Sequence, residues 1–310
     1  MLWWARKANL KTEGGSMKER DLAAHVIGLS PDIVRISECA QMRDASAAHI
    51  AELRSQVTHN RTLRHSGTTI VGFLYKNGVI MAADRQSTSG WEKEFESVKI
   101  HKITEHVLFG GAGLVALIQS MREAIIRTGK HFEGFLGNPL DVDSYALITK
   151  HLLKENFLAF GLYSEILGYI AVPIIAGVSA DQSRASLYSF DSAGAIYDHV
   201  SNSRQFAVIG SGSVYAKGVL EDSWAKNMSE DDAIRLAVRA IYRAGGSDIG
   251  SGHADINPPM IVLVTTNGLQ EVMEESVRKI AWSIRVDDCR RRGDMESARL
   301  YRRLLKGEKS

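Results

Sequence analysis

Cysteine is scarce in this chain, and long apolar runs are absent from it. Only Cys39 and Cys289 occur among its 310 residues, which is too few for a disulfide scaffold and suits a reducing compartment. No run of about 18 apolar residues occurs, so the sequence predicts no membrane span. Residues 1–7 place their charges after a short apolar patch, the reverse of a secretory signal. We therefore expect a cytoplasmic protein.

Positive charge is not concentrated in the part of the chain that reads as a folded body. The net charge of +2 divides into +3 over residues 1–67, −5 over residues 68–284 and +4 over residues 285–310. A nucleic-acid-binding domain presents a basic face, so the mildly acidic body argues against nucleic acid as a partner. We interpret the basic ends as solvated segments.

Residue 68 marks a change in the sequence pattern. Residues 1–67 show only weak periodicity, which is typical of a leader or pro-segment. Residues 69–75 are rich in β-branched and aromatic side chains. Asn77-Gly78 then separates this run from the apolar residues 79–83. Because both turn residues tolerate a positive φ, this pattern predicts a β-hairpin at the start of the body.

The rest of the body alternates pairs of helices with groups of strands. The pattern predicts strands over 106–110, 169–178, 185–190, 196–199, 206–209 and 260–265. It predicts helices over 113–128, 141–160, 214–226, 229–243 and 274–284, and an Arg-rich helix ending near 305. Strands in this order need helical cover on both sides. We therefore predict an α+β fold, a four-layer αββα sandwich with two central sheets between helix layers.

Gly67-Thr68-Thr69 stands where the leader meets the first strand. A cut before Thr68 would give this residue a free α-amine beside its own hydroxyl. Such an amine has a pKa of about 7.7–8.0 and can accept the hydroxyl proton. Threonine with its own amino terminus as base is one variant of the nucleophile–base pair. Taken alone, the tripeptide favours a plain turn before a strand over a cleavage site.

Five segments in order make the chain similar to a known family. They are Thr68–Gly72, Gly78–Arg85, Lys99, Gly210–Ser213 and Asp248–Gly252. From Thr68 to Ile284 the chain resembles the proteasome β-subunit family, most of all the catalytic β-subunit of the bacterial 20S core proteasome. The family has the fold of the N-terminal-nucleophile hydrolases, which is the sandwich predicted above.

The resemblance implies a role for each matching residue. Thr68 is the expected nucleophile, released by self-cleavage between Gly67 and Thr68. Asp84 is expected to pair with Lys99, whose positive charge favours the threonine alkoxide. Lys102 is the nearest alternative to Lys99 in the sequence.

Further residues match the family's supporting positions. Ser211, Asp248 and Ser251 are expected to hold the Thr68 amine and the nucleophilic water, and Gly113 to supply the oxyanion N–H. The positions expected to line the specificity pocket are Ser87, Ser97, Gly111 and Val115. Gly111 would give this pocket a small residue at its bottom, and Val115 would give it an apolar wall. Such a pocket predicts cleavage after large apolar residues.

The resemblance also implies an organisation and a set of partners. Residues 1–67 are expected to be a propeptide removed on autoprocessing, 68–284 the peptidase domain, and 285–310 a basic helical extension. The implied activity is that of a threonine endopeptidase that degrades unfolded proteins without a metal or organic cofactor. Identical subunits are expected to form a seven-membered ring that stacks on rings of α-subunits, with an ATPase as regulator.

Other interpretations of the residues stay open at this point. The chain could be another N-terminal-nucleophile amidohydrolase on the same fold, or a noncatalytic ring-forming subunit. The presence of Thr68 directly before a strand argues against the second. Asp248, His253 and Asp255 resemble a metal-ligand set, although Gly-rich loops often carry Asp for turns.

Overall fold

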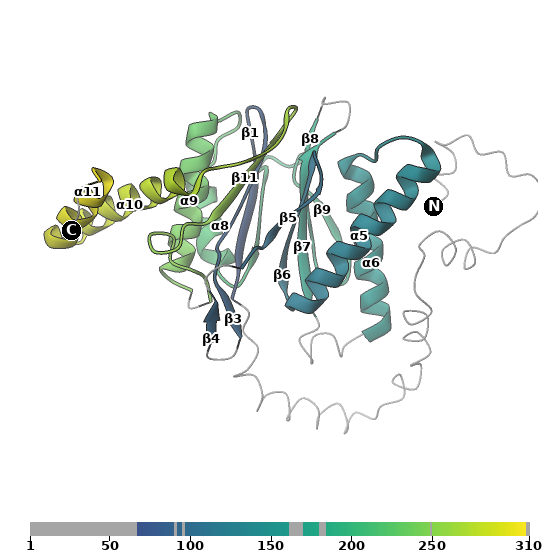
Figure 1. Ribbon diagram of the computed structural model, residues 1–310, viewed down its shortest axis with the longest axis horizontal. Helices are drawn as coiled ribbons and strands as arrows, with labels where there is room; N and C mark the ends of the chain where they lie inside the picture. The colour runs from purple at the N-terminus through teal and green to yellow at the C-terminus, as the bar shows by residue number, and fades with distance from the viewer. Residues whose placement is uncertain are drawn as a thin grey trace, which may run out of the picture. The chain divides into compact units, whose positions relative to one another are not determined.

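The structure, a computed structural model, describes residues 67–89, 92–94, 97–160, 170–179, 184–248 and 250–307. Two five-stranded antiparallel sheets lie face to face, with helices on their outer sides (Figure 1). This arrangement is the predicted αββα sandwich of the N-terminal-nucleophile hydrolases. No helix in the described ranges is long and apolar enough to cross a membrane.

The first sheet carries the hairpin predicted from Asn77-Gly78. Its strand order is β10-β1-β2-β11-β12. The strands are β1 (Thr69–Tyr75), β2 (Gly78–Ala83), β10 (Phe206–Gly210), β11 (Met260–Thr265) and β12 (Gly268–Glu271). The register pairs Ile70 with Ala83 and Thr69 with Gly210. The start of β1 therefore lies beside the ends of β2 and β10.

The second sheet has the order β5-β6-β7-β8-β9. Its strands are β5 (Ile100–Thr104), β6 (Val107–Gly113), β7 (Ala171–Val178), β8 (Ala185–Phe190) and β9 (Ile196–Asp198). A small separate hairpin joins β3 (Ser87–Ser89) to β4 (Glu92–Glu94). The sequence predicts four strands of the second sheet but neither β5 nor the small hairpin.

Four helices form the two outer layers. Helices α8 (Ser213–Ser223) and α9 (Glu230–Gly245) cover the first sheet, and α5 (Val115–Leu136) and α6 (Val142–Phe160) cover the second (Figure 1). Helix α9 begins with a side-chain cap, since the Ser229 side chain accepts a hydrogen bond from the backbone N–H of Asp232. Two further helices, α10 (Glu274–Arg291) and α11 (Met295–Leu305), end the chain.

Alternation along the strands of the first sheet produces its two buried faces. One set of side chains faces helices α8 and α9 and includes Val71, Phe73, Ile80, Ala82, Ile261 and Leu263. The next residues along face the second sheet and include Ile70, Val79, Met81, Val262 and Val264. Because successive strand side chains point to opposite faces, apolar residues at every position require cover on both sides. The near-continuous apolar runs of β1, β2 and β11 thus account for the four layers.

Helix α5 differs from its prediction at both ends. It begins at Val115 because Gly113 is the last residue of β6, with a φ of 129°. It continues past Gly129, where a Cβ would lie 2.4 Å from the Tyr145 ring. The helix ends where Gly137 takes the left-handed conformation with φ 68°. Glycine at 129 therefore serves helix packing, and glycine at 137 stops the helix.

Candidate active site

Thr68 lies directly before β1 and is almost fully buried, with 5% of its surface exposed. Gly210, which pairs with Thr69, has a φ of 97°, and a Cβ on it would lie 2.0 Å from the Thr68 carbonyl oxygen. Only glycine permits this close approach. The strand register thus brings the start of β1 against the loop that begins at Ser211.

A buried ion pair lies on one side of Thr68. Asp84 follows the last residue of β2, and Lys99 precedes the first residue of β5, so each comes from a different sheet. The Lys99 Nζ lies 2.8 Å from Asp84 Oδ1. It also donates to the carbonyl oxygen of Gly67 at 3.2 Å and to that of Gln86. The ammonium group therefore touches the Gly67–Thr68 junction itself.

The Asp84 carboxylate accepts three backbone N–H groups besides the lysine. Its Oδ1 accepts from the Thr69 N–H at 2.7 Å. Its Oδ2 accepts from Gln86 at 3.1 Å and from Gly252 at 3.0 Å. A buried carboxylate is stable only when it is paired and hydrogen-bonded. These bonds tie β1, the loop after β2 and the loop before β11 to a single charge.

Burial sets the protonation behaviour of Lys99. Its side chain is 6% exposed, and this desolvation lowers the pKa of Lys99 below its usual value of 10.5, while the nearby Asp84 charge opposes the shift. Lys102, the alternative in the sequence, is 52% exposed and pairs with Glu105 on the surface. The structure therefore places Lys99, and not Lys102, at the Thr68 junction.

A second polar cluster lies on the other side of Thr68. The Thr68 backbone N–H donates to Ser211 Oγ at 3.2 Å, and Ser211 Oγ donates to Asp248 Oδ2 at 2.6 Å. Ser251 Oγ donates to the same carboxylate oxygen, also at 2.6 Å. The three residues predicted to form a supporting group therefore meet, although they come from two separate loops.

Thr69 is a member of this cluster that the sequence analysis does not single out. Its Oγ1 lies 2.6 Å from Ser251 Oγ, and both residues are buried. Since the Ser251 hydroxyl donates to Asp248, it accepts from Thr69. A chain of hydrogen bonds thus runs from the Thr68 N–H through Ser211, Asp248 and Ser251 to Thr69. The only hint in the sequence is a polar side chain in an otherwise apolar strand.

Two glycines pack against each other at the junction. A Cβ on Gly67 would lie 1.8 Å from the Gly250 Cα, and a Cβ on Gly250 would lie 2.4 Å from the Gly67 Cα. Real Cβ atoms do not approach this closely, so both positions require glycine. The backbone of residue 67 therefore lies directly on the loop that carries Asp248 and Ser251.

Gly113 ends β6 in the second sheet. It pairs with Ala171, and a Cβ on it would lie 2.0 Å from the Ile170 carbonyl oxygen. Together with its positive φ of 129°, this contact explains why glycine occupies the position. Its expected role as an oxyanion donor stays a prediction.

The four residues predicted to line a specificity pocket lie in the elements around Lys99. Ser87 begins β3, and the Ser97 N–H donates to the Arg85 carbonyl oxygen at 2.9 Å. The Gly111 N–H donates to the Lys99 carbonyl oxygen at 3.4 Å. Val115 begins α5 and is 48% exposed. The preference for large apolar residues stays a prediction.

The space beside Gly111 is partly occupied. A Cβ on Gly111 would lie 2.7 Å from Ile118 Cδ1, and Ile118 is buried. Glycine at this position therefore lets the first turns of α5 pack closely on β6. Ile118 becomes a further residue that shapes this region.

Asp248, His253 and Asp255, the three residues that resemble a metal-ligand set, do not form a metal site. Asp248 accepts from both serines, His253 is exposed, and Asp255 accepts from the Tyr301 hydroxyl at 3.1 Å. In the described part of the chain, no three His, Cys, Asp or Glu side chains are grouped to hold a metal ion.

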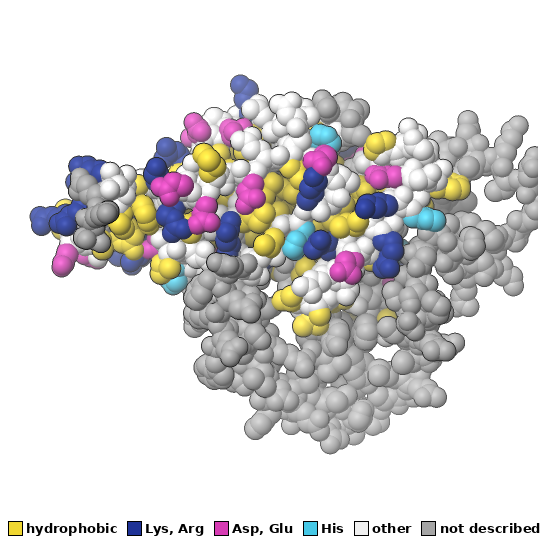
Figure 2. Space-filling view, in the orientation of Figure 1, with side chains coloured by type: hydrophobic (Ala, Val, Ile, Leu, Met, Phe, Trp, Pro, Cys, Tyr) yellow, Lys and Arg dark blue, Asp and Glu magenta, His cyan; other side chains and the backbone are white. Residues whose placement is uncertain are grey.

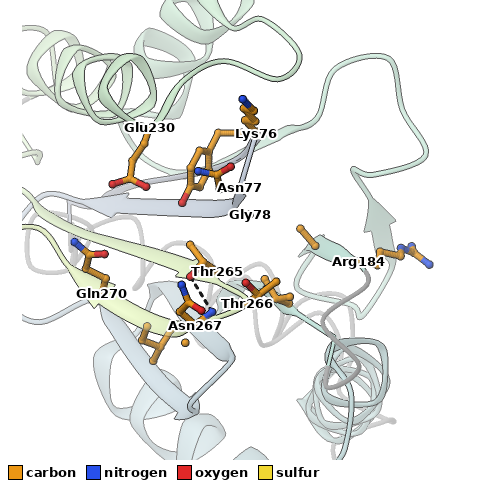
Figure 3. A pocket seen from close by; sticks show the side chains of 14 residues that line it. Lys76, Asn77, Gly78, Arg184, Glu230, Thr265, Thr266, Asn267 and Gln270 are labelled. Carbon is orange, nitrogen blue, oxygen red and sulfur yellow. Dashed lines mark hydrogen bonds between the residues drawn. The ribbon is translucent and has the colours of Figure 1, made fainter.

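A cavity of about 790 Å³ lies at the opposite ends of the strands from Thr68 (Figure 3). The turn of the first hairpin (Lys76, Asn77) and the β11–β12 turn (Thr265–Asn267) line it, with Arg184 and Glu230 nearby. None of the residues predicted for catalysis lines this cavity. It is therefore separate from the cluster around Thr68.

The fold and the polar residues around Thr68 together define a class of protein. Two sheets between helix layers, with a buried threonine at the start of the first strand, are the architecture of N-terminal-nucleophile hydrolases. The chain belongs to the proteasome subunit family, because the family model described as "Proteasome subunit" matches residues 65–256.

Curated relatives agree with this assignment. A "Proteasome subunit beta" of Frankia casuarinae is 30% identical over 258 residues, covering 81% of this chain and 90% of the relative. A protein of the same name from Mycobacterium sp. (strain KMS) is 28% identical, covering 79% of this chain and 81% of the relative. "Proteasome subunit beta 2" of Thermomonospora curvata is 30% identical, covering 70% of this chain and 76% of the relative.

Proposed function

We propose that this chain is a threonine endopeptidase, the catalytic β-subunit of a bacterial core proteasome, and that it cleaves itself between Gly67 and Thr68. One observation supports this more than any other. Two polar clusters converge on the backbone of a single buried threonine, one at its amide nitrogen and one at the carbonyl that precedes it. A threonine that only began a strand would need neither cluster.

The first proposed step is the release of the nucleophile. In the uncut chain the Thr68 nitrogen is an amide and cannot accept a proton. The Thr68 hydroxyl attacks the Gly67 carbonyl carbon, and the bond to the Thr68 nitrogen breaks as that nitrogen takes up the hydroxyl proton and becomes an amine. Water then hydrolyses the resulting ester. Lys99 donates to the Gly67 carbonyl oxygen at 3.2 Å, where its charge stabilises the developing oxyanion. Residues 1–67 thereby act as a propeptide, and the uncut chain is inactive.

The second step uses the new α-amine as a general base. Its pKa of about 7.7–8.0 suits proton transfer near neutral pH. Ser211 accepts an N–H from this nitrogen, which leaves the lone pair available to take the proton of the Thr68 hydroxyl. The oxygen attacks the substrate carbonyl, the amine returns the proton to the leaving group, and water resolves the acyl-enzyme. The Gly113 N–H is the proposed oxyanion donor.

The two carboxylates have different proposed tasks. Asp84 keeps the buried Lys99 protonated, and the ammonium charge favours the Thr68 alkoxide. Asp248 fixes the direction of both serine hydroxyls, so that Ser211 turns an acceptor lone pair toward the Thr68 nitrogen and Ser251 turns one toward the Thr69 hydroxyl. Neither task requires a metal or an organic cofactor.

The proposal extends to substrates and assembly. Ser87, Ser97, Gly111 and Val115 are proposed to line the specificity pocket. Substrates are unfolded proteins cut after large apolar residues. The relatives are named proteasome subunit beta, which supports assembly into a proteasome. The proposed assembly is a seven-membered ring of identical subunits, and its proposed location is the cytoplasm. Rings of α-subunits and an ATPase are the proposed partners, with residues 68–284 as the peptidase domain and 285–310 as an extension of it.

Replacing the nucleophile tests the proposal. Thr68→Ala is expected to retain residues 1–67 and to have no peptidase activity. Thr68→Ser, which keeps a hydroxyl, is expected to retain part of both activities. Intact mass and hydrolysis of a fluorogenic peptide measure the two separately. Peptidase activity surviving in Thr68→Ala would exclude the assignment.

A further inference from the structure

The last two helices contact the loop that carries Asp248 and Ser251. Helices α10 and α11 pack against each other as a hairpin, turned at Gly293 (φ 76°) and capped by Asp294, whose side chain accepts from the Ser297 N–H. They lie beyond residue 256, where the match to the family ends. Figure 2 shows Lys and Arg side chains gathered at the outer end of this hairpin. Its inner side faces the body.

Asp255 is the contact point on the loop. Its side chain is 6% exposed, and its Oδ2 accepts from the Tyr301 hydroxyl of α11 at 3.1 Å. The Arg285 Nε of α10 lies 3.7 Å from the same oxygen. The guanidinium group of Arg285 also lies over the Tyr301 ring, 5.7 Å from its centroid. Both helices therefore stabilise one buried carboxylate, α10 with a positive charge and α11 with a hydrogen bond.

Helix α10 holds the backbone of the same loop at two more points. The Trp282 indole N–H donates to the Asp255 carbonyl oxygen at 3.1 Å, and Arg278 donates to the Ile256 carbonyl oxygen at 3.4 Å. Such bonds to backbone oxygens fix the path of a loop in a way that side-chain packing alone does not. The loop is thus anchored on its outer side by the hairpin.

The inner side of the loop is anchored at the candidate active site. The Gly252 N–H donates to Asp84 Oδ2, and Ser251 bonds both Asp248 and Thr69. Only His253 and Ala254 separate Gly252 from Asp255, and Ala254 is completely buried. Because so few residues lie between the two anchors, movement at Asp255 displaces Ser251.

We propose that the C-terminal hairpin is a brace for the Asp248–Ser251 loop, with Tyr301 and Arg285 as positioning residues. They act through Asp255 and touch no reacting atom. The expected effect of the brace on kcat rests on the proposed function. The structural coupling between Tyr301 and the loop does not, because it can be measured without any activity. The brace gives a role to a segment that the family match does not cover.

The test uses the full-length chain as purified, with Tyr301→Phe as the central variant. This change removes one hydroxyl and keeps the ring that stacks on Arg285. Hydrogen exchange is followed for the backbone N–H groups of residues 250–252. Loss of a hydrogen bond to a charged group predicts exchange at least tenfold faster there. Arg302→Ala, an exposed change on the same helix, is the matched control and leaves exchange unchanged.

A double-mutant cycle separates the brace from general destabilisation. Asp255→Ala, which removes the acceptor, is expected to accelerate the same exchange on its own, and adding Tyr301→Phe to it is expected to have little further effect, because the pair is already broken. Exchange within twofold of the parent in Tyr301→Phe overturns the brace. So does an equal acceleration throughout the chain.

Kinetics supply the catalytic arm of the test. In Tyr301→Phe, kcat is expected to fall about tenfold with KM unchanged, because the loop positions catalytic groups and not substrate. If the parent is active and Tyr301→Phe has the same kcat, the positioning role is overturned. A parent chain with no peptidase activity contradicts the proposed function instead, and the exchange result still decides whether the brace exists.

Discussion

The hydroxyl of Thr69 lies 2.6 Å from that of Ser251, and the backbone N–H of Thr69 donates to Asp84. One residue therefore joins the two polar clusters that converge on its neighbour Thr68. Its side chain orients Ser251 and hence the Asp248 group, while its backbone binds the carboxylate that pairs with Lys99.

Removing the Thr69 hydroxyl is expected to reduce turnover. Thr69→Val keeps the shape of the side chain and leaves Ser251 without its donor. A net loss of about 1 kcal/mol for one hydrogen bond predicts a kcat about fivefold to tenfold lower. Thr69→Ser keeps the hydroxyl and is expected to stay within twofold of the parent. Equal activity of the valine and serine variants would show that the hydroxyl has no part in positioning.

Replacing Gly67 is expected to block maturation. In Gly67→Ala the new Cβ would overlap the Gly250 backbone, so the junction cannot lie against the Asp248–Ser251 loop. Intact-mass spectrometry over time is expected to show residues 1–67 retained for much longer than in the parent. Gly134→Ala is the control, because a Cβ at that position meets no atom within 4 Å. Normal processing of Gly67→Ala would contradict the close packing described here.

Breaking the buried ion pair is expected to cost stability. Asp84→Asn leaves the Lys99 ammonium buried without its counter-charge, and removal of one partner from such a pair costs about 3–5 kcal/mol. A clear fall in melting temperature is therefore expected. Lys102→Ala, which breaks an exposed pair, is expected to change stability by less than about 0.5 kcal/mol. Similar melting temperatures for the two variants would contradict the structural importance of Asp84.

The pH dependence of activity follows from the burial of Lys99. Because desolvation lowers the pKa of Lys99, its charge is lost at a lower pH than for an exposed lysine. The alkaline limb of kcat/KM is therefore expected to lie below pH 10.5. The Asp84 charge raises this pKa, so in Asp84→Asn the limb is expected to move to lower pH. A shift to higher pH in a pH–rate profile would show that the limb belongs to another group.

Local sequence was sufficient for the features that depend on near neighbours. The first hairpin forms as predicted, although its turn residues are Lys76 and Asn77 and neither Asn77 nor Gly78 takes a positive φ. Strands 185–190 and 260–265 match the structure at both ends. The start of α5 could not be predicted in this way. Gly113 resembles a helix start locally, but it ends a strand because the Ile170 carbonyl lies against it, and that contact depends on the whole sheet.

The candidate site also contains residues that the sequence predicts and residues that only distant contacts bring in. The resemblance to the family predicted Asp84, Lys99, Ser211, Asp248 and Ser251, and the structure brings them together at Thr68. Thr69 and Tyr301 were not predicted. Thr69 contributes a hydroxyl to the cluster, but the sequence pattern of residues 69–75 indicates only a strand. Tyr301 lies outside the family match. Both belong to the site only through contacts across the fold.

The most direct measurement is the intact mass of the chain in a purified particle that hydrolyses peptides. We expect a single species of this chain, with Thr68 as its first residue. A particle with full hydrolytic activity whose subunits all keep residues 1–67 would contradict it.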